Sequence, residues 1–252
     1  MGKKILIAGE SWSSTTIHTK GFDSFVTSMY AEGIQWLENA FSNGGYTVDF
    51  MPNHYAAVKF PYTIEEIDKY DVVLLSDIGT NTLLISPDTF NQGKRFPNRC
   101  ELIKRYVEAG GGLCMVGGYM TFTGIDARGR WGSTPVKDVL PVKLLPYDDR
   151  VESPHGAAAK IVDRDHPVVK GLPDEWPVLL GFNKVIEDTS LGKVIATIDG
   201  EPLIACGEFK KGRSVAFTSD CSPHWAPLEF CNWEYYGKLW CNIADWLCKA
   251  AG

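Results

Sequence analysis

The sequence lacks a long hydrophobic run. Nowhere in its 252 residues do about 18 consecutive apolar residues occur, the length that can cross a membrane as a helix. The first apolar segment, residues 5–8, is too short to serve as a secretion signal. These absences predict a cytoplasmic protein with no membrane partner.

Basic residues are in deficit, with 25 Lys and Arg against 31 Asp and Glu and a formal net charge of −6. A protein that binds nucleic acid or an anionic membrane surface needs a basic face. We therefore predict no nucleic-acid partner.

The seven cysteines follow no recognisable pattern. Their number is odd, no pair has C-x-x-C spacing, and no cysteine–histidine array has the spacing of a zinc finger. Reduced thiols are the simplest interpretation. We predict no metal and no cofactor. A divalent cation held by His54, His224 and a carboxylate stays an alternative, because spacing cannot show whether these groups converge.

Short apolar segments alternate with helical patterns in the first half of the chain. Residues 5–8, 72–75 and 113–116 are continuous apolar runs, typical of strands buried on both faces of a parallel sheet, and residues 46–51 add another strand. Residues 102–107 predict one helix. Helical spacing also relates the following positions: Met29, Gly33, Trp36, Leu37, Ala40 and Phe41.

The pattern changes between residues 135 and 203, where proline and glycine are frequent and residues 158–162 and 193–198 resemble short strands. A strand at 214–218 and a helix carrying Trp233 to Leu247 close the chain. This order predicts an α/β fold with a mostly parallel central sheet and a β-rich excursion in the second half. Because no linker-like stretch interrupts it, we expect a single domain over residues 1–252.

In a doubly wound sheet, ligands bind beyond the carboxyl ends of the strands. The residues that follow the predicted strands are therefore the candidates for a site. As catalytic residues we predict Glu10, Asp77, Cys221 and His224. As ligand-binding residues we predict Ser11, Trp12, His54, Gly79, Gly117, Gly118, Tyr119 and Trp225.

Each candidate also has a purely structural interpretation. Glu10 could cap a helix, and Asp77 with Gly79 could form an ordinary turn or a loop of backbone N–H donors. His54, like His18, could lie in a surface loop. Cys221 and His224 are spaced as Cys-x-x-His, which could lower the pKa of the thiol, or they could belong to a turn built around Pro223.

Several segments resemble a known family. Residues 110–119 (GGGLCMVGGY) resemble the helix end, strand and elbow of class I glutamine amidotransferase-like proteins, and residues 166–173 (HPVVKGLP) resemble a segment of their ThuA-like relatives. Residues 212–225 are similar to the late strand and histidine loop of an amidotransferase-like branch. Together with residues 76–79, the resemblance spans nearly the whole chain.

The resemblance implies a flavodoxin-like three-layer α/β sandwich. In true amidotransferases a cysteine occupies the elbow and a histidine oriented by a glutamate acts as the base. Here the elbow falls at Gly117 and Gly118, Cys114 lies earlier within the strand, and Ala226 stands where that glutamate would be. Standard glutamine hydrolysis is therefore not expected.

Three functional hypotheses follow. In the first, the protein binds or acts on a small polar metabolite by acid–base chemistry, with His224 as base, Glu10 or Asp77 as its partner, and residues 123–132 as a mobile lid. The second is a thiol-dependent hydrolase or transferase that uses Cys221 and His224. The third is a non-catalytic homo-oligomeric binding protein. Its contact would be formed by the late aromatic residues Trp225, Phe230, Trp233 and Tyr235.

Overall fold

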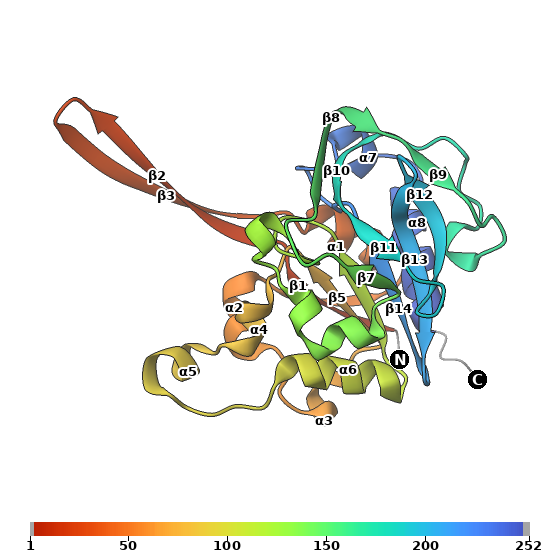
Figure 1. Cartoon of the computed structure of the whole chain (residues 1–252), viewed down its shortest axis with the longest axis horizontal. Helices are drawn as coiled ribbons and strands as arrows, with labels where there is room; N and C mark the ends of the chain where they lie inside the picture. The colour runs from red at the N-terminus through yellow and green to blue at the C-terminus, as the bar shows by residue number, and fades with distance from the viewer. Residues whose placement is uncertain (1–2, 249–252) are drawn as a thin grey trace.

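The computed structural model describes residues 3–248 and contains a central sheet of eight strands in the order β4-β1-β5-β6-β14-β13-β12-β9 (Figure 1). The pairings from β4 to β14 are parallel, and those from β14 to β9 are antiparallel. The strands of this sheet are β1 (Lys4–Gly9), β4 (Thr47–Met51), β5 (Val72–Ser76), β6 (Gly112–Val116), β9 (Ala159–Ile161), β12 (Lys193–Ile198), β13 (Glu201–Phe209) and β14 (Gly212–Phe217).

Helices cover both faces of the sheet, because the buried strands direct alternate side chains to opposite sides. Ile5 and Ile7 of β1 join a core with α1 and α8, whereas Leu6 and Ala8 join a core with α2, α3, α4 and α6. The α-helices are α1 (Gln35–Asn43), α2 (Asn53–Lys59), α3 (Ile64–Ile67), α4 (Thr80–Leu84), α5 (Pro87–Gln92), α6 (Arg99–Ala109), α7 (Leu228–Cys231) and α8 (Tyr236–Cys248). The predicted three-layer α/β sandwich is confirmed.

The β-rich excursion contributes to the sheet edge and adds two small antiparallel pairs, β10 with β8 and β11 with β7. Their bounds are β7 (Val142–Leu144), β8 (Arg150–Ala157), β10 (Leu179–Asn183) and β11 (Val185–Glu187). Short 3-10 turns lie at Ile125–Ala127, Trp131–Ser133, Pro135–Val139 and Pro167–Val169.

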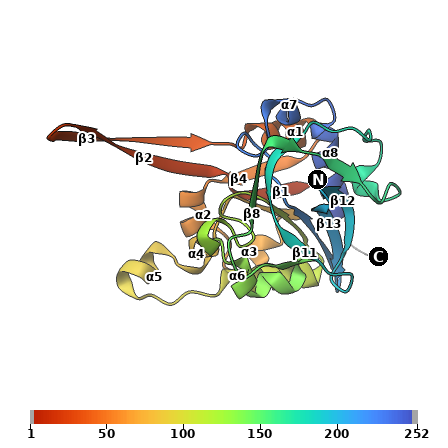
Figure 2. The same cartoon turned by 45° about the horizontal axis from the view of Figure 1, so that its top comes forward.

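One sequence prediction about the fold is wrong. The helix expected to include Met29 begins only at Gln35, because Met29 belongs to a long hairpin of β2 (Ser11–Lys20) and β3 (Asp23–Glu32). Figure 2 shows this hairpin projecting away from the sheet and its helices.

The parallel strands lie in the spatial order β4-β1-β5-β6-β14. When these five strands are numbered 1 to 5 along the chain, their spatial order is 2-1-3-4-5, which is the order found in flavodoxin. The chain moves from β1 to β4 on one side and returns to β5 on the other, so strand order reverses between β1 and β5. This switch point places the residues that follow β1 and β5 side by side.

Candidate functional site

A cavity of about 400 Å³ lies beyond the carboxyl ends of β1, β5 and β14. Its position at the switch point is where ligands bind in doubly wound sheets. Its lining residues are Glu10, Trp12, Asp77, Tyr119, Asp220, Ser222, Pro223 and His224.

Glu10 forms part of the floor of this cavity and is only 2% exposed. It follows β1 with a left-handed backbone (φ 46°), a conformation that costs a non-glycine residue free energy and is concentrated at functional sites. Its Oε2 accepts a hydrogen bond from Ser76 Oγ at 2.5 Å, and its Oε1 accepts one from Ser222 Oγ at 2.6 Å. Burial, reinforced by the negative charge of Asp220, raises the pKa of Glu10 to about 7.

Asp77 follows β5 and, like Glu10, has a left-handed backbone conformation, with φ 44°. Its Oδ1 accepts a hydrogen bond from the Met120 backbone N–H at 2.8 Å. Burial, together with the charge of Glu10, raises the pKa of Asp77 to about 6. Gly118 is required beside it, since φ is +146° there and a Cβ would lie 3.0 Å from Asp77 Oδ1.

Asp220 and His224 form the third charged element, on the loop after β14. Asp220 Oδ1 accepts the backbone N–H groups of Cys221 and Ser222, while its Oδ2 lies 3.5 Å from His224 Nδ1. This contact with Asp220 raises the pKa of His224, and burial raises the pKa of Asp220. The carboxylate therefore orients the imidazole and favours its protonated form.

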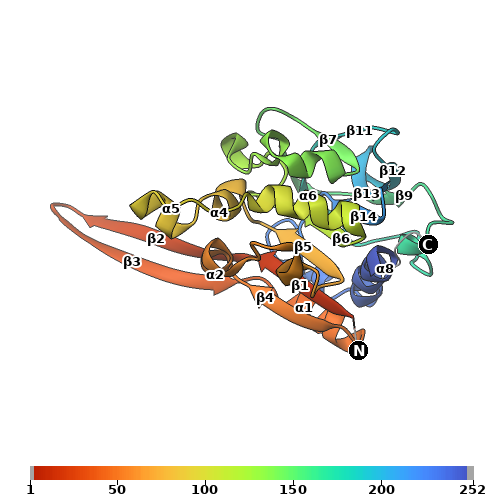
Figure 3. The same ribbon diagram turned by 90° about the horizontal axis from the view of Figure 1, so that it is seen from below.

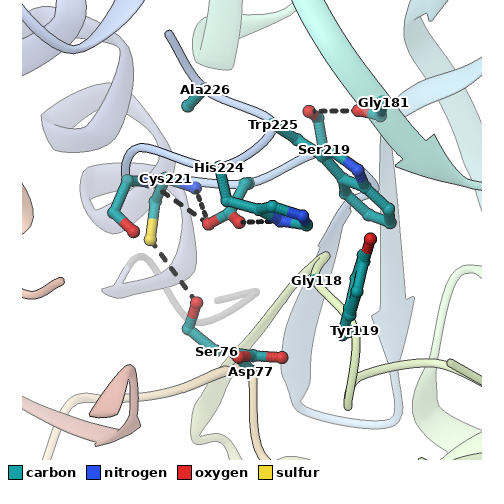
Figure 4. A network of polar contacts seen from close by, with 12 residues as sticks. Ser76, Asp77, Gly118, Tyr119, Gly181, Ser219, Cys221, His224, Trp225 and Ala226 are labelled. Atoms are coloured by element: carbon teal, nitrogen blue, oxygen red, sulfur yellow. Dashed lines mark hydrogen bonds and ion pairs between the residues drawn. The ribbon is translucent and has the colours of Figure 1, made fainter. Parts of the chain in front are cut away.

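Aromatic rings enclose the exposed side of His224. Its ring meets Tyr119 edge-on at 4.4 Å and stacks on Trp225 at 5.3 Å, and Figure 4 shows both rings on the side of His224 opposite Cys221. Glu152 fixes this wall, because its carboxylate accepts hydrogen bonds from the Tyr119 hydroxyl and from Trp225 Nε1, both at 2.9 Å. Tyr119 therefore faces the cavity, and Trp225 packs against Tyr119 outside the cavity lining.

The Cys221 thiol faces away from the imidazole. It is fully buried, lies 3.6 Å from Glu10 Oε2 and 3.4 Å from Ser76 Oγ, and Figure 4 shows it directed toward Ser76. Burial raises its pKa well above the usual value. This environment does not activate the thiol, and it gives Cys221 no contact with His224.

The amidotransferase elbow likewise has no thiol. β6 ends at Val116, Gly117 and Gly118 follow, and Cys114 is fully buried within the strand, where burial raises its pKa. A Cβ at Gly117 would lie 2.1 Å from the Thr218 carbonyl oxygen, so this glycine serves the close approach of the chain after β14.

One group of described residues has the geometry to hold a metal ion. The ligand atoms of Glu10, Asp220 and Cys221 lie within 4.8 Å of one another, and all three residues are buried. Both oxygens of Glu10 already accept serine hydroxyls, and Cys221 would have to lose its proton first. The alternative set with His54 does not form, because His54 is outside the cavity lining.

Several predicted site residues lie elsewhere. His54 is exposed on α2 with its ring against Tyr30 and Tyr55, and His18 lies on the hairpin. Gly79 faces a separate hollow, and Ser11 Oγ accepts the backbone N–H of Asn53. None of these four residues lines the cavity, and the Ser11 hydroxyl is already hydrogen-bonded.

The predicted lid is a packed loop. Asp149 accepts the backbone N–H groups of Thr123 and Gly124, and the buried Trp131 donates to the Ile78 carbonyl at 2.9 Å. These hydrogen bonds anchor both ends of the segment to other parts of the fold.

The predicted aromatic contact surface is exposed only in part, at the half-buried Trp233 and Tyr235. Trp225 and Phe230 are buried in the core, at 1% and 0% exposure, and are unavailable to a partner.

Four residues that support the site were not among the predicted site residues: Ser76, Ser222, Glu152 and Asn183. Ser76 and Ser222 adjoin the predicted residues in the sequence, so proximity could have suggested them. Glu152 and Asn183 come from the β-rich excursion, and no sequence pattern near them indicates a site. The Asn183 side chain accepts the Gly118 backbone N–H and donates to the Gly118 carbonyl.

Comparisons with known proteins agree with this architecture. Residues 4–249 match the sequence profile of a family described as "Putative glutamine amidotransferase". The cytoplasmic protein STM3548 from Salmonella typhimurium is 44% identical, with a TM-score of 0.94 over 98% of this chain and 99% of that chain. The cytoplasmic protein STM1381 from Salmonella typhimurium LT2 is 44% identical, with a TM-score of 0.93 over 97% and 99%.

A ThuA-like protein from Parabacteroides merdae shares the fold at 14% identity, with a TM-score of 0.56 over 99% of this chain and 91% of that chain. No curated protein matches the sequence. The chain belongs to the glutamine amidotransferase-like family, which confirms the resemblance seen in the sequence. Both Salmonella relatives are described as cytoplasmic, in agreement with the expected location, and no helix within residues 3–248 is long and apolar enough to span a membrane.

Proposed function

We propose that this protein binds a small, polar, uncharged or cationic metabolite in the cavity at the switch point and acts on it by acid–base chemistry. The observation that carries the proposal is the charge of the lining. Glu10, Asp77 and Asp220 supply three carboxyl groups, and among residues 3–248 no lysine or arginine lines the cavity. A carboxylate or phosphate ligand would meet repulsion there, whereas hydroxyl or amino groups would find acceptors.

The proton-transfer groups are His224 and Asp77. A general acid or base works best when its pKa lies near the working pH. The pKa of Asp77 is raised to about 6, and the pKa of His224 is raised by Asp220. In its neutral form His224 acts as the base, with Asp77 as its partner, and the charge of the more deeply buried Glu10 raises the pKa of Asp77.

Matched ligands test this proposal. Thermal unfolding is measured with neutral hexoses, the corresponding hexosamines and the corresponding hexuronates. A ligand at ten times its Kd stabilises a protein by about 1.4 kcal/mol, which is about 3–6 °C at this size. We expect shifts from neutral or amino members and none from the acids.

The variants His224→Gln and Asp77→Asn should lose the shift, and Lys238→Gln, an exposed change on α8, should keep it. Stabilisation by hexuronates alone, or equal shifts in both site variants, would contradict the proposal. The same preparations should release no ammonia from glutamine, because the elbow after β6 carries no thiol.

A further inference from the structure

The hairpin of β2 and β3, called the arm below, projects from the body, and only its base contacts other elements, through Ser11, Trp12 and Tyr30. Each strand has ten residues, paired without interruption from Ser11 opposite Glu32 to Lys20 opposite Asp23. At about 3.4 Å per residue the arm is about 34 Å long. Within residues 3–248, the hydrogen bonds and ring contacts of residues 13–29 all stay inside the arm.

Each face of the arm carries exposed apolar side chains among serine and threonine residues. Cross-strand pairing places Trp12, Phe25 and Met29 on one face. Ile17, Val26 and Tyr30 share the other. Ile17 is 70% exposed, Val26 and Met29 are each 60% exposed, and Phe22 at the tip is fully exposed. An isolated two-stranded hairpin is marginally stable in water, so an arm of this composition needs a cover on both faces.

A second apolar surface lies on the same side of the molecule. It is formed by α2, α4 and α5, and we call it the ledge. Figures 1 and 3 show the arm and α5 extending from the body in the same direction. The exposed apolar side chains of the ledge are Tyr55, Val58, Leu84, Ile85 and Phe90.

We propose that two copies of this chain form a two-fold dimer in which each arm lies across the ledge of the other copy. A two-fold contact requires a surface and its complement on the same side of one chain, and the arm and ledge meet this condition. The arm carries little charge, one lysine against two acidic residues over residues 11–32, so two arms can approach although each chain has a net charge of −6.

The apolar area agrees with a stable dimer. Arm and ledge together expose twelve large apolar side chains in each copy. A fully exposed aromatic side chain offers about 150–250 Å². Six of the twelve are aromatic, so at roughly half exposure these six alone supply on the order of 600 Å² per copy and 1,200 Å² per dimer. Standard interfaces bury about 1,200–2,000 Å² and permanent ones about 2,000–5,000 Å² in total.

The dimer would also order the cavity wall, since Trp12 begins the arm and lines the cavity. The inference does not depend on the proposed function, because the residues on which it rests, apart from Trp12, lie outside the cavity.

The test is the mass of the full chain in solution, measured by size-exclusion chromatography with light scattering at about 100 µM. We expect twice 27.9 kDa for the wild type. Ile17→Asp on the arm and Phe90→Asp on the ledge should each give 27.9 kDa. Ile186→Asp, at an exposed apolar residue of β11, is the matched control and should leave the dimer intact. Circular dichroism checks that each variant is folded.

A wild-type chain that stays at 27.9 kDa would overturn the proposal. So would a dimer that survives both Ile17→Asp and Phe90→Asp, because its contact would then lie elsewhere. Loss of the dimer in Ile17→Asp alone would overturn the pairing of arm with ledge.

Discussion

Replacing Glu10 with glutamine should stabilise the protein above neutral pH. The pKa of Glu10 rises from 4.5 to about 7 in the folded state, because burial and the charge of Asp220 disfavour its anion. The folded state therefore holds this proton more tightly than the unfolded state. The resulting stabilisation is complete below pH 4.5 and is lost as the pH rises through about 7.

The magnitude follows from the two pKa values. Each unit of difference between the two pKa values corresponds to about 1.4 kcal/mol. At pH 8 the ionised carboxyl group of Glu10 therefore lowers the free energy of unfolding by about 3 kcal/mol. A neutral amide of the same shape avoids this cost. It keeps one acceptor oxygen, and the hydroxyl of Ser76 or Ser222 can rotate to accept its N–H.

Urea denaturation at about pH 5 and pH 8 measures the effect. We expect Glu10→Gln to match the wild type within about 1 kcal/mol at pH 5 and to exceed it by about 3 kcal/mol at pH 8. Glu234→Gln, at an exposed glutamate, controls for the loss of one negative charge. A variant that is less stable at both pH values, or a difference that is independent of pH, would refute the reasoning.

Three further predictions concern other parts of the chain. Asp220→Asn should lower the pKa of His224 in an NMR titration of the imidazole, since contact with Asp220 is the largest cause of its elevation; an unchanged pKa would exclude this pairing. Cys221 should resist iodoacetamide at neutral pH in the native protein and react after unfolding, because its thiol is buried and its pKa is raised. Rapid labelling of the native protein would instead support the hypothesis of a thiol-dependent enzyme. Arg99→Lys should lower the free energy of unfolding, measured in urea, by about 3 kcal/mol. The reason is that an ammonium group cannot replace the buried guanidinium, which donates to four backbone carbonyls. A loss below about 1 kcal/mol would contradict this prediction.

The sequence was sufficient to predict the buried sheet. Strands such as β5 and β6 are continuous apolar runs, and that pattern has few other interpretations in a chain with intervening helices. The arm was missed for a physical reason. Phe22, Phe25, Val26, Met29 and Tyr30 repeat at helical spacing, yet Phe22 lies in the turn and the other four belong to β3, with apolar side chains on both faces. A single buried face, the usual source of strand periodicity, is absent there.

The site was predictable as far as topology determines it. Glu10, Asp77, Tyr119 and His224 follow strand ends and line one cavity. His54 follows a strand end too, but α2 begins at Asn53 and turns its ring outward.

Strand order therefore gave the location of the site but not the direction of each side chain. Residues from the excursion, such as Glu152, reach the site only through tertiary packing, which leaves no local pattern.

The central claim is that buried carboxyl groups in the cavity exchange protons near neutral pH. Carbon-13 NMR titration of the side-chain carboxyl groups tests it most directly, with Glu10→Gln and Asp77→Asn used for assignment. The account predicts one transition near pH 7 from Glu10 and one near pH 6 from Asp77, with the Asp77 transition moving to lower pH in Glu10→Gln. If both carboxyl groups titrated below about pH 5, as ordinary exposed carboxyl groups do, the acid–base account of this site would be wrong.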